Sequence, residues 1–143
     1  MSWFARGEIE QLRRDLEAER SLRTVAESTS ERLRAGLDAV PAGIVLADHR
    51  GVTVLRNRAA SVGGHVEVLV EEAVERLLAS AAAGQADEQR LTLFGPPTRV
   101  LLVRGIPLAG GGGLAVIDDL SDRARVDAVR TDFVSNISHE LKT

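Results

Sequence analysis

The spacing of apolar residues changes twice along the chain, and this change constrains the fold more than any other feature of the sequence. Residues 7–38 contain no proline and repeat apolar residues every three or four positions, which is the spacing of one helix face. Between residues 43 and 117, short apolar runs alternate with turn residues, as they do in strands. From Ser121 the helical spacing returns and continues to the last residue. The pattern therefore predicts an α+β domain flanked by two helices.

The first 38 residues form the predicted N-terminal helical linker. A heptad register that starts at Ile9 also assigns Glu19, Arg23 and Ser30 to the seam, and these residues are polar. We interpret residues 1–38 as a coiled-coil-like helix with a slipped seam that forms a parallel dimer. The alternative is a single solvated helix that packs on its own domain.

Residues 39–120 are predicted to form one domain with a five-stranded antiparallel sheet. Pro41 ends the first helix, because the residue before a proline disfavours helical geometry. Asn57 is placed to cap a short helix over residues 58–61, and a longer helix follows over residues 66–82. Helices are expected on one face of the sheet. The expected strands are residues 43–48, 52–55, 88–94, 98–104 with an extension towards residue 108, and 113–117.

Composition excludes several classes of function. The chain has no cysteine, so disulfides, thiolate metal sites and thiol nucleophiles are excluded. Its formal net charge is −3 and no basic block is present, which argues against direct binding of nucleic acid. No apolar run approaches the roughly 20 residues that span a bilayer, so we expect the chain as written to be soluble.

The beginning of the central domain resembles a PAS domain. The sequence from Asp38 to Ala60 contains a Pro-x-Gly opening, Asp48 before the glycine of a hairpin, and Asn57 before a short helix. The resemblance implies a sensory domain over residues 39–120. The stretch after Asn57 is shorter than in typical members of the family, and this argues against a large bound cofactor.

The end of the central domain carries a second point of resemblance. Asp119-Leu120-Ser121, followed by Arg123, resembles the Asp-x-Thr element that often closes PAS domains. Ser121 is expected to cap the exit helix, and Asp119 is expected to pair with Arg123 four residues further on. Asp119, Ser121 and Arg123 are therefore predicted to relay signals from the domain to the helix.

The last residues carry the most specific motif. Residues 130–143, Arg-Thr-Asp-Phe-Val-Ser-Asn-Ile-Ser-His-Glu-Leu-Lys-Thr, are similar to the first dimerisation helix of HisKA-type sensor histidine kinases of two-component systems. With the PAS-like domain, the chain resembles a phosphate-responsive sensor kinase of actinobacterial type. The resemblance makes residues 121–143 the start of the dimerisation helix and His139 its phosphoacceptor. It also implies that Thr143 positions water for dephosphorylation of the partner regulator.

Helix geometry is compatible with this role for His139. At about 100° per residue, Phe133 and Ile137 lie on one apolar stripe, and His139 falls roughly 160° from Ile137. The stripe can pack in a bundle while the imidazole faces solvent. The imidazole must be neutral for one ring nitrogen to attack the terminal phosphoryl group of ATP, and the adjacent Glu140 can accept a hydrogen bond from the other nitrogen. The bland alternative is an ordinary solvated His–Glu pair.

The resemblance also implies the activity and partners of the whole protein. That protein is expected to be a homodimeric histidine kinase that phosphorylates His139 with ATP and magnesium and transfers the phosphoryl group to an aspartate of a response regulator. It is expected to sit at the cell membrane with these residues in the cytoplasm. Because the chain ends inside the motif, we expect a piece of a longer protein that lacks the ATP-binding domain and is inactive alone.

Two alternative functions remain open at this point. The PAS-like domain could be a ligand-free dimerisation and docking module that receives signals from an accessory regulatory protein. It could also be a haem-based redox or gas sensor with His65 as the iron ligand. His49 is interpreted as a hairpin residue, and Gly110 to Gly113 as a hairpin connection, because no Lys-Ser/Thr pair or helix follows those glycines.

Overall fold

The computed structural model describes residues 2–61, 63–64 and 66–141. By its internal contacts the chain consists of two units, residues 1–39 and residues 40–143. The first unit is one helix, α1 (Ser2–Ala39), whose apolar residues, such as Ile9, Leu12 and Leu33, are exposed. The helix is as predicted, and its pairing into a coiled coil stays a prediction.

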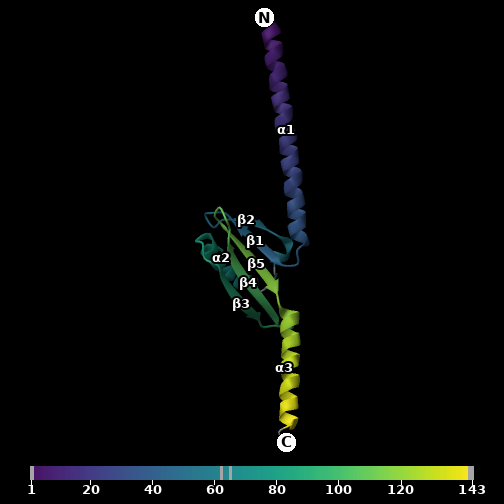
Figure 1. The fold of residues 1–143 in the computed structure, drawn as a ribbon, viewed down its shortest axis with the longest axis vertical. Coiled ribbons are helices and arrows are strands. Elements are labelled where there is room, and N and C mark those ends of the chain that lie inside the picture. The colour runs from purple at the N-terminus through teal and green to yellow at the C-terminus, as the bar shows by residue number, and fades with distance from the viewer. Residues whose placement is uncertain (1, 62, 65, 142–143) are drawn as a thin grey trace. The chain divides into compact units, whose positions relative to one another are not determined.

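The second unit contains a five-stranded antiparallel sheet (Figure 1). Its order is β2-β1-β5-β4-β3, so the last strand of the chain lies in the middle. The α+β class and the five-stranded antiparallel sheet of the prediction are therefore confirmed. The elements are β1 (Gly43–Ala47), β2 (Thr53–Arg56), the 3-10 helix η1 (Arg58–Ala60), α2 (Glu67–Ala82), β3 (Asp87–Leu93), β4 (Arg99–Pro107), β5 (Gly113–Asp119) and α3 (Ser121–Leu141).

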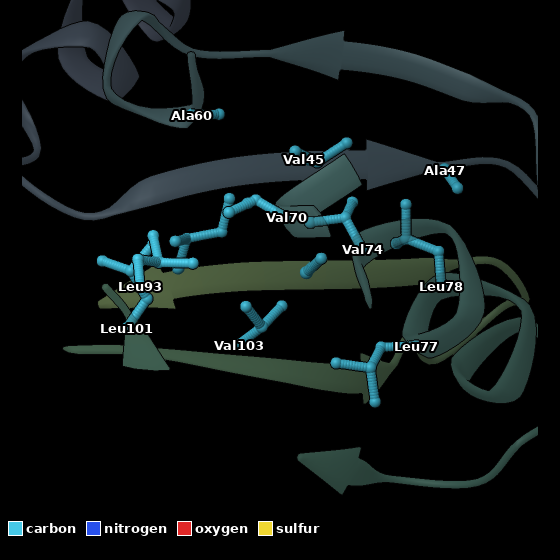
Figure 2. Close-up of a cluster of buried hydrophobic side chains, with 12 residues drawn as sticks. Val45, Ala47, Ala60, Val70, Val74, Leu77, Leu78, Leu93, Leu101 and Val103 are labelled. Atoms are coloured by element: carbon cyan, nitrogen blue, oxygen red, sulfur yellow. The ribbon is translucent and has the colours of Figure 1, made fainter. Parts of the chain in front are cut away.

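The core of this unit lies between α2 and one face of the sheet (Figure 2). Val45, Leu77 and Val103 are fully buried there, and each contributes roughly 1.5–3 kcal/mol to folding. The strands have glycine residues at the positions where α2 crosses the sheet. A Cβ on Gly105 would lie 2.6 Å from the carbonyl oxygen of Leu77, and a Cβ on Gly113 would lie 2.8 Å from Ala81 Cβ. The helix therefore rests directly on the strands, and no room for a ligand is left at these crossings.

Asn57 fixes the turn between the first hairpin and the helices. Its side chain is 3% exposed and accepts hydrogen bonds from the amides of Ile44 at 2.8 Å and Ala60 at 3.1 Å. Its amide group donates to the carbonyl of Ala42 at 3.0 Å. The predicted cap of the short helix is therefore confirmed, and the same side chain also anchors the start of β1.

Candidate functional site

The candidate site is the junction at which β5 ends and α3 begins. Leu120 continues the pairing of β5 for one residue, because its amide donates to the carbonyl of Val100 in β4 at 2.7 Å. Ser121 is the first residue of α3 and is only 7% exposed. The amide of Ala124 donates to the carbonyl of Leu120 at 2.9 Å, which begins the helical hydrogen bonding directly at the end of the strand.

The Ser121 hydroxyl joins strand and helix. It accepts a hydrogen bond from the Val100 amide at 3.0 Å and donates one to the Asp119 carboxylate. The Asp119 carboxylate also accepts a hydrogen bond from the Ser121 amide at 2.9 Å. The capping role predicted for Ser121 therefore falls to Asp119, because a helix leaves its first amides without an acceptor and this carboxylate lies beside one of them.

The partner of Asp119 is also different from the predicted one. Its second carboxylate oxygen pairs with Arg99 at the start of β4, at 3.1 Å. The predicted pair of Asp119 with Arg123 is wrong: β4 and β5 run side by side with Leu101 opposite Asp119, and this register carries the guanidinium of Arg99 to the carboxylate. Arg123 lies exposed on the first turn of α3.

The electrostatics of the junction favour the ionised form of Asp119. Partial burial raises the pKa of this carboxyl group, but hydrogen bonds from the Ser121 hydroxyl and amide lower it, and the Arg99 guanidinium lowers it further. The net effect is a pKa below the ordinary value. We call Arg99, Val100, Asp119 and Ser121 the junction latch, since together they tie the first residue of α3 to two adjacent strands.

The latch begins the helix that carries the predicted phosphoacceptor. His139 and Glu140 lie near the end of α3, and both side chains are exposed. His139 is 18 positions after Ser121 along α3, which corresponds to about 27 Å of helix. The predicted apolar stripe is also exposed: Phe133 is 65% and Ile137 is 40% accessible. Thr143, predicted to position water for dephosphorylation, and His65, the iron ligand of the haem alternative, lie outside the described residues.

The described residues contain no group of three or more His, Cys, Asp or Glu side chains that could hold a metal ion. Within the same part of the chain, no helix is long and apolar enough to cross a membrane. Sequence reasoning missed Arg99 and the Val100 amide, which complete the latch. The position of Arg99 at the start of a strand is visible in the sequence, but it identifies Arg99 as a partner of Asp119 only once the pairing of β4 with β5 is known.

Similar proteins link the chain to sensor kinases. The chain is 31% identical over 128 residues to the sensor-like histidine kinase SenX3 of Mycobacterium tuberculosis, a match that covers 81% of this chain and 30% of the relative. A 27-residue stretch is 67% identical to SenX3 of Mycolicibacterium smegmatis, over 19% of this chain and 7% of the relative. The alginate biosynthesis sensor protein KinB of Pseudomonas aeruginosa is 27% identical over 135 residues, covering 81% of this chain and 23% of KinB.

These matches relate the chain to sensor histidine kinases over most of its length, while the chain spans less than a third of those proteins. No family model matches the chain. Among solved structures, the PAS domain of Bordetella pertussis BvgS aligns with a TM-score of 0.45 at 23% identity, over 76% of this chain and 98% of that one. The phage VqmA–DPO complex aligns with a TM-score of 0.47 at 14% identity, over 76% of this chain and 61% of that one.

Proposed function

We propose that the chain is the sensory and phosphoacceptor portion of a two-component sensor histidine kinase, and that His139 is phosphorylated. The observation that carries the proposal is the similarity to sensor-like histidine kinases over 81% of the chain. The resemblance of residues 130–143 to a phosphoacceptor helix adds to it, as does the exposure of His139 on α3. The ATP-binding domain of the whole protein is proposed to lie outside these residues.

In the proposed reaction, the neutral imidazole of His139 attacks the terminal phosphorus of ATP. A nitrogen–phosphorus bond forms, the bond from that phosphorus to the bridging oxygen breaks, and ADP leaves with the electron pair of that bond. Glu140 accepts a hydrogen bond from the other ring nitrogen and so stabilises the positive charge that develops on the ring. The phosphoryl group then passes to an aspartate of a response regulator, and Thr143 positions water for its later hydrolysis.

The junction latch is proposed to transmit the signal. Ser121 is bonded to β4 through the Val100 amide and to β5 through Asp119, so a change in the relative position of the two strands must reorient the first turn of α3. The helix then carries this change to His139, since a helical bundle has discrete packing arrangements. A homodimer that pairs α1 and the apolar stripe of α3 between two copies would supply such a bundle.

The source of the signal is proposed to be a partner protein. The observation that favours this alternative over a small molecule is the contact of α2 with the sheet at Gly105 and Gly113, because the helix leaves no space for a ligand at these two crossings. The haem alternative depends on His65 and therefore rests on the sequence alone. In the whole protein these residues are proposed to lie on the cytoplasmic side of the membrane.

Labelling of the full-length protein tests the assignment. We expect a His139→Gln variant to incorporate no phosphate from ATP labelled at the terminal phosphate. A His49→Gln variant is the matched control, because His49 is also exposed but lies in the β1–β2 turn. Incubation of the present chain with ATP should leave it unmodified until the ATP-binding domain is added in trans. Labelling of the His139→Gln protein at the wild-type level would refute the proposal.

A further inference from the structure

The outer edge of β3 is a long, regular strand edge, and no other described strand pairs with it. β3 is the last strand in the sheet order, and it pairs with β4 over all seven residues without a change of register. The opposite edge, β2, has only four residues, and its pairing with β1 shifts register between Leu46 and Ala47. Short length and bulges protect sheet edges from association, so β2 is protected and β3 is not protected in this way.

Two opposite charges on β3 are free to act across that edge. Glu88 and Arg90 are exposed, and because they are two residues apart they point to the same face of the sheet. The residue opposite Glu88 on β4 is Arg104, but its guanidinium is paired with Asp118 at 2.5 Å. Within the described part of the chain, no ion pair uses Glu88 or Arg90.

We propose that β3 pairs in antiparallel fashion with β3 of a second copy of the chain, around a two-fold axis at Gln89. In this register Glu88 of each copy lies opposite Arg90 of the other, which gives two ion pairs on one face. Other registers that keep the α2 helices of both copies on the same face of the joined sheet differ from this one by a shift of two residues, because a shift of one residue exchanges the two faces. They would place Arg90 opposite Arg90 or Glu88 opposite Glu88, so the charges select one register.

The other face of β3 accommodates the same register. A groove of about 250 Å³ lies between α2 and β3, and Leu69 and Leu91 are among its lining residues. A second β3 would lie along the open side of this groove. Asp87, which would lie opposite Leu91 of the second copy, is already paired with Arg76 at 3.6 Å.

This contact uses the sheet edge and leaves the apolar stripes of α1 and α3 unused. It would therefore act in addition to the helical dimer and would join such dimers side by side. An isologous contact of this kind is self-complementary, as most contacts between identical chains are. Its consequence for a sensor would be lateral clustering.

The absence of cysteine from the sequence allows a direct test with single cysteines in the full chain. We expect Gln89→Cys to form a disulfide-linked dimer rapidly under mild oxidation, because directly opposite residues have Cβ atoms about 5 Å apart. The matched control is Thr92→Cys, since two Thr92 residues would be separated by about six positions along the strand, or roughly 20 Å. Equal rates for the two variants would overturn the proposal.

Charge exchange tests the register. In the Gln89→Cys background, we expect Glu88→Arg or Arg90→Glu alone to slow disulfide formation by roughly tenfold or more, because two attractive pairs become repulsive. The double variant restores both pairs with reversed sign and should recover the original rate. Circular dichroism establishes that each variant is folded. A double variant as slow as the single variants, or single variants as fast as the parent, would overturn the proposed pairing.

Discussion

Removal of the Ser121 hydroxyl is the perturbation that probes the junction latch most sharply. In Ser121→Ala the buried Val100 amide, in a residue that is 8% exposed, loses its acceptor. An unsatisfied buried donor costs about 1–3 kcal/mol. The bond lost by Asp119 adds little, because its side chain is 48% exposed and water can replace the hydroxyl. We therefore expect the junction to be destabilised by about 2 kcal/mol, which corresponds to roughly thirtyfold more frequent opening.

Hydrogen exchange at the Leu120 amide measures that opening. This amide keeps its own acceptor, the Val100 carbonyl, in the variant, so its exchange rate reports opening and not the loss of its own bond. We expect it to exchange about thirtyfold faster in Ser121→Ala than in the parent chain. Ser135→Ala, at an exposed position of α3, is the control and should leave the rate unchanged. A rate within about threefold of the parent in Ser121→Ala would refute the latch, since the predicted opening energy would be absent.

The remaining predictions concern acid stability and helix packing. The pKa of Asp119 is lowered in the folded chain, so its stabilising effect is fully present above its unfolded pKa of about 3.9 and is lost as the pH falls through the folded pKa. We therefore expect opening of the junction, measured by hydrogen exchange at the Leu120 amide, to become more frequent over this pH range. The same pH dependence of opening in Asp119→Asn would contradict the assignment to Asp119. Gly105→Ala places a Cβ 2.6 Å from the Leu77 carbonyl oxygen and should destabilise the domain by about 1–3 kcal/mol in denaturant unfolding. Gly36→Ala, in α1 with no neighbour within 4 Å, is the control and should not destabilise it.

The elements of the central domain were predictable because their signals are local. Alternating apolar runs bounded by turn residues locate the strands to within a few residues, and the predicted strand over residues 113–117 corresponds to β5. Asn57 could be identified as a cap because its capping contact is local, to the amide of Ala60 three residues further on. The position of His139 on a continuous helix likewise follows from local spacing alone.

The contacts that define the latch could not be predicted in the same way. Arg99 and Asp119 are 20 residues apart, and their pairing depends on the register that sets Leu101 opposite Asp119. A shift of the register would have offered Asp119 a different partner. The local alternative, Arg123 four residues along the helix, was therefore the wrong partner. The same reason hides the order of the strands, in which β5 enters between β1 and β4.

The location of the phosphoryl group tests the central claim most directly. Trypsin cleaves after Arg130, and the peptide that follows contains one histidine, His139, together with hydroxyl residues such as Ser135 and Ser138. After labelling of the full-length protein with ATP, the account predicts one phosphoryl group on this peptide, stable in base and labile in acid, as a nitrogen–phosphorus bond is. An acid-stable label on a serine or threonine, or a label confined to other peptides, would contradict the account.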